Sequence, residues 1–153
     1  MRRKNRITKG TIILDVLAAV FILGLGAAAV FGLLPVVKKS QTIANDENKA
    51  MQMANRMIEH LHLLPARDIS LATLRGLNLV DENQTGSPYS FAHVPMDDAS
   101  LYSPAQVLKN AVATLEIEDT DANSKKAVIR ISWKSASGKT KQITTGTIIG
   151  GYR

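Results

Sequence analysis

The sequence predicts an α+β protein, with a long N-terminal α-helix, membrane-spanning in its first half, packed on a small C-terminal antiparallel β-sheet. An apolar run whose one charge is Asp15 extends from Thr11 to Val37. An amphipathic helical pattern follows, and the C-terminal third of the 153-residue chain contains segments in which apolar and polar residues alternate. These patterns divide the chain into residues 1–10, 11–37, 38–64 and 65–153, and we expect a soluble head only in the last two.

Positive charge is concentrated at the N-terminus. The formal net charge is +6 at pH 7, and five positive charges without an acid lie within the first ten residues. The rest of the chain then carries +1, so a basic patch on the head is not expected and nucleic acid is an unlikely partner. The sequence contains no cysteine, which removes disulfides, thiolate zinc sites and cysteine nucleophiles from consideration.

Residues 11–37 are expected to cross the lipid bilayer as a helix. At 1.5 Å per residue this segment reaches roughly 40 Å, more than the roughly 30 Å of a bilayer core. The larger Lys/Arg cluster precedes it, whereas Lys38 and Lys39 are soon followed by Asp46 and Glu47. The positive-inside rule therefore predicts a cytoplasmic N-terminus and an extracytoplasmic head.

Asp15 is the unusual residue of this segment. A secretory signal cut after Ala29 and an ordinary signal anchor both fit the apolar run, but neither explains a carboxylate within it. A charge at mid-helix depth costs roughly 2.5 to 3.5 kcal/mol on insertion scales, so an intramembrane acid is a candidate functional residue. The alternative is that Asp15 lies shallow, at the level of the headgroups, without a role.

The leader carries a resemblance to a known family. A short basic segment ending in Gly10, then aliphatic residues with an acid five positions after that glycine, resembles the signal of type IV pilins and type II secretion pseudopilins. The resemblance implies cleavage by a prepilin peptidase between Gly10 and Thr11, methylation of Thr11, and an assembly role for Asp15. The family usually has phenylalanine at the position of Thr11 and glutamate at that of Asp15, so the chain departs from the pattern at both.

The spacing of this motif has its own physical reason. Cleavage after Gly10 would create a free amine at a helix N-terminus, where the macrodipole disfavours positive charge. Asp15 lies four residues after Thr11, so its carboxylate can pair with that amine within one chain or between packed neighbours.

The rest of the apolar helix also has features of an assembly surface. Gly24, Ala28 and Gly32 share one face in the small-xxx-small pattern that lets helices approach closely in lipid. Pro35 predicts a kink or a local unwinding of the helix.

Residues 38–64 are expected to form an amphipathic helix that ends before Pro65. Its apolar stripe needs a partner, which the C-terminal sheet can supply. The residues of the stripe are Ala50, Ala54, Met57, Ile58 and Leu61.

The segment between this helix and the sheet has weaker patterns. We expect a turn-rich loop at Asp81 to Pro88 and a brief helix from the N-cap Ser103 to about Asn110. A short helix at Asp68 to Leu77 would turn three leucines inward, namely Leu71, Leu74 and Leu77.

Three alternating segments predict an antiparallel meander, with a polar loop at Asp119 to Lys126 and a hairpin at Ser135 to Lys139. Trp133, the largest apolar side chain of the sheet, is expected to pack on Met57, Ile58 and Leu61. The residues of the inward face are Ala113, Leu115 and Ile117, then Ile129, Ile131 and Trp133, then Ile143, Thr145, Thr147 and Ile149.

Catalytic motifs are missing from the sequence. His60 and His62 are two residues apart and would point to different sides of a helix, and His93 is isolated. There is no G-x-S-x-G and no glycine-rich phosphate loop after a strand. We therefore expect no enzyme, no metal and no cofactor.

The sequence thus favours a structural subunit. A-N-R-M-I-E-H-L (Ala54 to Leu61) and I-R-I-S-W (Ile129 to Trp133) resemble minor pilins and minor pseudopilins. This implies a pilin fold, a single-pass location in a bacterial inner membrane, and three kinds of protein partner: prepilin peptidase, other pilins or pseudopilins, and an inner-membrane assembly platform. The alternatives are a signal-anchored periplasmic binding module and a small secreted protein cut after Ala29.

Overall fold

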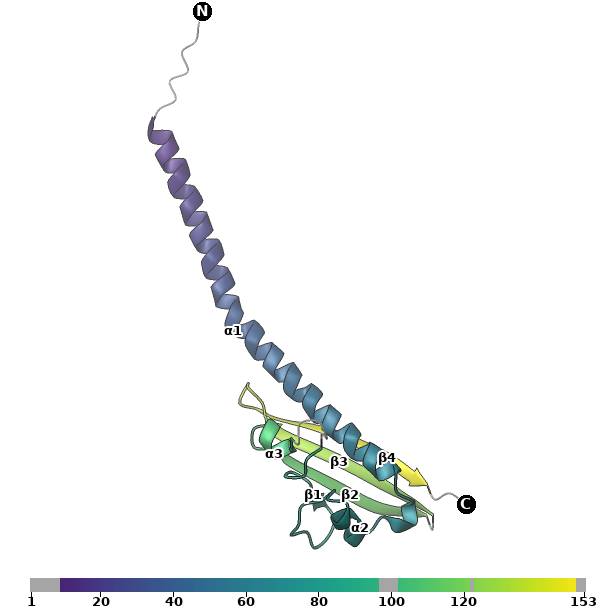
Figure 1. The fold of residues 1–153 in the computed structure, drawn as a ribbon. Helices are drawn as coiled ribbons and strands as arrows, with labels where there is room; N and C mark the ends of the chain where they lie inside the picture. The colour runs from purple at the N-terminus through teal and green to yellow at the C-terminus, as the bar shows by residue number, and fades with distance from the viewer. Residues whose placement is uncertain (1–8, 97–101, 122, 151–153) are drawn as a thin grey trace, which may run out of the picture. The chain divides into compact units, whose positions relative to one another are not determined.

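The structure is a computed structural model that describes residues 9–96, 102–121 and 123–150 (Figure 1). It is an α+β protein with a long N-terminal helix and a four-stranded antiparallel sheet, as the sequence predicts. The chain divides into two compact units, Met1–Ser40 and Gln41–Arg153, which we call the N-terminal unit and the head.

Helix α1 extends over Lys9–His62, and it joins the two helical segments that the sequence predicts. Its backbone stays helical on both sides of Pro35, so the predicted local unwinding is wrong. A proline removes one hydrogen bond and crowds the carbonyl of residue i−4. Several turns on each side keep their own hydrogen bonds, and the helix therefore continues past that defect.

The sheet has the order β1-β2-β3-β4, and each pair of neighbours is antiparallel. Its strands are β1 Tyr89–Ser90, β2 Val112–Asp121, β3 Ser124–Lys134 and β4 Thr140–Gly150. The three predicted strands are confirmed. Strand β1 was not predicted, because a strand of two residues is too short to show an alternating pattern in the sequence. Strands β2 and β3 extend into the predicted loop at Asp119 to Lys126, so that loop was predicted too long, and their pairing has a bulge or irregularity between Asp119 and Asp121. The predicted β3–β4 hairpin is confirmed, with Gly138 at φ +82°.

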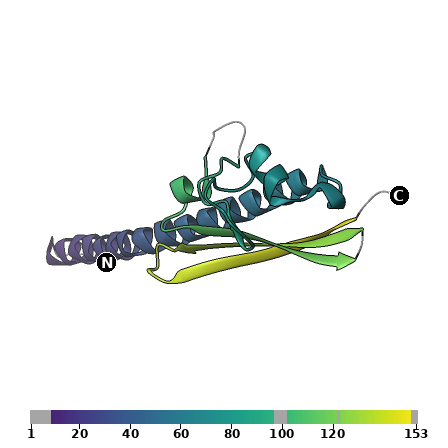
Figure 2. The same cartoon turned by 90° about the horizontal axis from the view of Figure 1, so that it is seen from below.

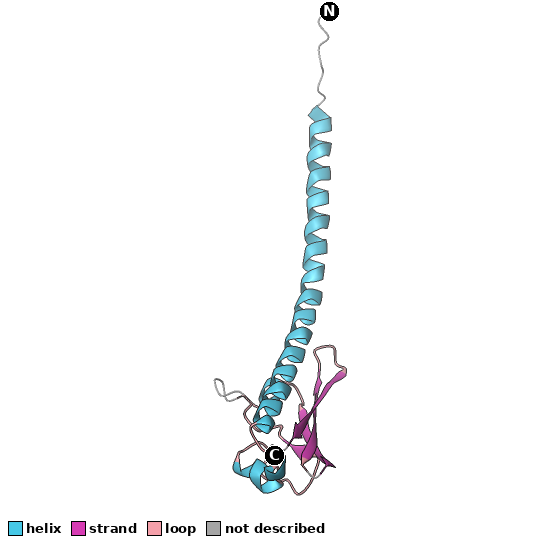
Figure 3. Cartoon of the chain, turned by 90° about the vertical axis from the view of Figure 1, so that its right-hand side faces the viewer, coloured by secondary structure: helices cyan, strands magenta, loops and turns pink. Residues whose placement is uncertain are grey.

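One face of the sheet forms the core with the helices. Figure 2 shows α1, α2 and α3 on the same side of the sheet, and Figure 3 shows the strands in a single layer. On α1, the predicted stripe is buried at Ala50, Ala54, Met57 and Leu61 and half-buried at Ile58, and Met53 is a buried addition. Opposite it, the buried sheet residues are Ala113, Leu115, Ala127, Ile129, Ile131, Trp133 and Ile149.

Two side-chain contacts define how α1 lies along β4 within the head. Glu47 forms an ion pair with Lys141, and His62 Nε2 lies 2.7 Å from Thr147 Oγ1. Trp133 pairs with Lys141 across the β3–β4 ladder, so it lies toward the Glu47 end of the helix. Trp133 belongs to the same core as Met57, Ile58 and Leu61, and its direct packing on these three residues stays a prediction.

The connections are short helices: η1 Ala66–Asp68, α2 Leu71–Gly76 and α3 Pro104–Val107. Leu74 is buried and Leu71 half-buried as predicted, but Leu77 is 50% exposed, because α2 has already ended and Leu77 is its C-cap. Helix α3 begins with a capping box between Ser103 and Gln106. It is shorter than predicted because the chain becomes extended at the buried Leu108.

Candidate functional site

The N-terminal unit presents an unusually apolar surface. One helix in the described part of the chain is long and apolar enough to cross a membrane, and its most apolar window has a mean hydropathy of 2.5 with no residue buried. Between Ile13 and Val37 the large apolar side chains are 49% to 72% exposed. Water-soluble monomers rarely expose a contiguous apolar surface of this size, so this one needs lipid or another protein around it.

Asp15 is the one charged residue on this surface. It lies in helical backbone, is exposed, and has no ion pair with another described residue. Thr11 precedes it by four residues in the same helix, so the two positions share one face, one turn apart. The carboxylate is thus available to a cation from the start of a neighbouring helix or from its own N-terminus.

The predicted cleavage site lies in the first turn of α1. The structure describes the backbone of Gly10 and Thr11 as helical, and residues 1–8 of the leader lie outside the described residues. All of the net charge belongs to this unit: residues 1–40 contain seven Lys or Arg and one acid, whereas residues 41–153 contain twelve of each sign.

Gly24, Ala28 and Gly32 form a strip without large side chains on the same helix. A Cβ atom added at Gly24 or at Gly32 would meet no other atom within 4 Å. Successive members are four residues apart, so they lie nearly above one another on α1. The helix backbone is therefore accessible along this strip to a second helix.

The predicted histidine positions do not form a metal site. His60 lines a cavity of the head, His62 contacts Thr147, and His93 is on the loop after β1. Within residues 9–96, 102–121 and 123–150, no group of three or more His, Asp or Glu side chains is placed to hold a metal ion.

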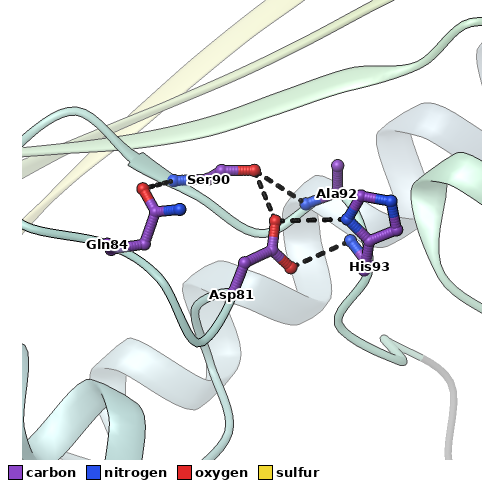
Figure 4. Close-up of polar contacts among 5 residues, drawn as sticks. All are labelled: Asp81, Gln84, Ser90, Ala92 and His93. Atoms are coloured by element: carbon purple, nitrogen blue, oxygen red, sulfur yellow. Dashed lines mark hydrogen bonds and ion pairs between the residues drawn. The ribbon is translucent and has the colours of Figure 1, made fainter.

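Sequence reasoning missed one polar cluster, centred on Asp81 (Figure 4). Asp81 Oδ2 accepts a hydrogen bond from Ser90 Oγ at 2.5 Å, and Oδ1 accepts one from the backbone N–H of His93 at 3.0 Å. His93 Nδ1 lies 3.5 Å from the same carboxylate. No signal in the sequence joins these residues, because the fold of the loop alone brings them together.

The contacts in this cluster are not those that would activate Ser90 as a nucleophile. A catalytic serine gives its proton to a histidine that an aspartate orients. Here Ser90 donates its hydrogen bond to Asp81 directly, and the ring of His93 contacts the same carboxylate oxygen, Oδ2, and not the serine. Gln84 Oε1 accepts a hydrogen bond from the backbone N–H of Ser90 at 2.9 Å, so the cluster fastens the loop between Asp81 and His93.

This loop forms one wall of a cavity of about 850 Å³ at the end of α1. Leu63, Leu64 and Leu79 supply apolar lining, and His60, Asp81 and Glu82 supply polar groups. Leu63 is 80% exposed, which leaves the cavity open to solvent. Its lining is not specific enough to name a ligand.

Comparison with known proteins returned no match to a family model, to a curated protein or to a solved structure.

Proposed function

We propose that the chain is a minor pilin or minor pseudopilin, a structural subunit that is inserted in the membrane, cut after Gly10 and assembled into a filament or its primer. The observation that carries this proposal is the position of Asp15, one helical turn after Thr11 at the start of an apolar, unburied helix. A plain membrane anchor has no use for a carboxylate at that position.

In this proposal, cleavage creates the partner of Asp15. The new Thr11 amine is positively charged and lies at the helix N-terminus, where the positive end of the macrodipole destabilises it. When two helices pack side by side, the Asp15 carboxylate of the neighbouring subunit neutralises that charge. In a medium of low dielectric constant such an ion pair is much stronger than in water. Processing by prepilin peptidase thus prepares the subunit for assembly.

The rest of the chain is compatible with this function. The strip of Gly24, Ala28 and Gly32 gives a second helix a place to approach closely. In the head, an amphipathic helical segment covers one face of an antiparallel sheet, which is the coarse layout that the pilin fold requires. The proposed location is a bacterial inner membrane, with the basic leader in the cytoplasm and the head outside it.

A second candidate is an anchored extracytoplasmic binding module without a role in a filament. The open cavity of about 850 Å³ favours it, since ligand sites are usually concave and partly apolar. In that case Asp15 is a shallow residue and its removal has no effect on association.

The test compares Asp15→Ala with Asp15→Glu. Both variants should insert in the membrane and be cut after Gly10, because the Thr11 nitrogen is still a peptide nitrogen in the precursor. Only the glutamate variant should recruit partner subunits, measured by cross-linking and pull-down from membranes. Equal recruitment by the alanine variant would show that Asp15 does not mediate assembly.

A further inference from the structure

The cations of the head are not all neutralised in the same way. On the sheet, four of them form ion pairs with acids. The pairs are Lys125 with Asp119, Lys126 with Glu118, Arg130 with Glu116 and Lys141 with Glu47. Each acid in these pairs lies on a neighbouring strand or on α1, so most of the sheet is electrically balanced.

One end of the sheet is different. Lys134 directly precedes the β3–β4 hairpin and Lys139 is its last residue. Both are exposed and form no ion pair with a described residue. Lys109 lies beside them, because its carbonyl oxygen accepts a hydrogen bond from the backbone N–H of Lys134 at 2.8 Å. We call Lys109, Lys134 and Lys139 the hairpin lysines. They form a local basic patch on a head whose total charge is zero.

The hairpin lies at the end of the head where the chain enters it. From Glu47 to His62 along α1, the contacts on β4 advance from Lys141 to Thr147. Strand β4 therefore leads away from Gln41 as α1 does, and the hairpin that precedes β4 is at the Gln41 end. Figure 1 shows the β3–β4 connection at this end of the sheet and the C-terminal end of β4 at the other.

This end cannot be far from the membrane if α1 spans it. Gln41 follows Val37, the last residue of the apolar run, by only four residues. Four residues reach at most about 14 Å even when fully extended. Within the head, the β2–β3 turn is about 34 Å from the hairpin along β3, at about 3.4 Å per residue.

We propose that the hairpin lysines bind the phosphates of anionic phospholipids in the membrane that α1 spans. Ammonium groups interact with lipid phosphates as point charges, and unpaired lysines have no competing acid to release first. The contact would hold the head against the bilayer before assembly. This proposal rests on the membrane anchoring within the proposed function, but not on cleavage or on filament formation.

The experiment uses the full chain reconstituted in lipid vesicles. Because the chain has no cysteine, Ser137→Cys places one fluorophore on the hairpin, and Asn123→Cys places it on the β2–β3 turn as a control. Vesicles of phosphatidylcholine, with or without phosphatidylglycerol, carry a nitroxide quencher on a fraction of the headgroups. We expect stronger quenching of the Ser137→Cys label in the anionic vesicles, and no lipid dependence for the Asn123→Cys label.

Charge variants then identify the groups responsible. Each lysine near an anionic surface should shift the docked population about fivefold, so Lys109→Gln, Lys134→Gln and Lys139→Gln together should reduce it roughly a hundredfold. Salt at about 1 M should do the same. Lys125→Gln, Lys126→Gln and Arg130→Gln remove the same charge from the paired cations and should leave quenching unchanged.

The outcomes separate this proposal from the proposed function. A chain that does not float with the vesicles at all contradicts membrane anchoring and both proposals with it. A chain that floats but shows equal quenching in neutral and anionic vesicles overturns the lipid contact alone. If soluble heparin changes the fluorescence of the Ser137→Cys label in neutral vesicles while anionic lipid has no effect, the patch binds another polyanion. That result would also overturn the proposed lipid contact.

Discussion

Trp133 is the residue whose replacement tests the packing of the head most severely. It is the one tryptophan of the chain and is only 1% exposed. Its indole Nε1 is buried and has no hydrogen-bond partner among the described residues. The side chain therefore contributes a large apolar surface to the core and also carries one unsatisfied donor, two effects of opposite sign.

Two substitutions separate these effects. Trp133→Ala removes the whole ring, and a change of this kind costs about 3 to 5 kcal/mol. Since a domain is stable by only about 5 to 15 kcal/mol, much of the stability of the head would be lost. Trp133→Phe also removes buried carbon, but it relieves an unsatisfied donor worth about 1 to 3 kcal/mol, so we expect a net change within about 1 kcal/mol.

The assay is thermal unfolding of the full chain in detergent micelles, followed by circular dichroism in the β-sheet signal. For a head of this size the alanine variant should lower Tm by at least about 10 °C, and the phenylalanine variant by no more than about 5 °C. An unchanged Tm for Trp133→Ala would place the side chain outside the core. A phenylalanine variant as unstable as the alanine variant would show that the indole donor has a partner.

Three further substitutions test other features. Gly10→Val should leave the full-length precursor in the membrane, because the peptidase must fit closely around residue 10; a gel that shows the ten-residue-shorter form would rule out the prepilin interpretation. Gly138→Ala should destabilise the head by about 1 to 2 kcal/mol because φ is +82°, whereas Gly86→Ala, without a positive φ, should not, and equal Tm values would contradict the hairpin geometry. Asp81→Asn should cost about 1 to 3 kcal/mol and speed hydrogen exchange between Asp81 and His93, and Glu82→Gln serves as its exposed control. No difference in exchange between these two would mean that Asp81 does not fasten the loop.

Much of the architecture could be predicted because it depends on periodicity. The stripe from Ala50 to Leu61 repeats every three or four residues, and the strands around Leu115, Ile131 and Ile149 repeat every two. Both patterns reflect burial on one face, which the sequence records directly. The N-cap at Ser103 and the turn glycine at Gly138 were predictable for the same local reason.

The remaining features depend on tertiary contacts that periodicity does not record. Strand β1 exists only because Tyr89 and Ser90 meet the edge of β2. How α1 lies along β4 within the head is decided by contacts such as Glu47 with Lys141, 94 residues apart in the chain. The Asp81 cluster and the unpaired hairpin lysines likewise depend on which side chains the fold brings together. The net charge of zero on the head therefore gave no sign of the local excess of positive charge at the hairpin.

The most direct test of the proposed function is the identity of the mature N-terminus. Mass spectrometry of the N-terminal peptide, from chain purified out of the membranes of a host that contains a prepilin peptidase, distinguishes the candidates in one measurement. We predict a peptide that begins at Thr11 and carries an N-methyl group. A peptide that begins at Met1 would indicate a simple signal anchor, one that begins at Val30 would indicate a secreted protein, and either would contradict the proposal that this chain is a processed filament subunit.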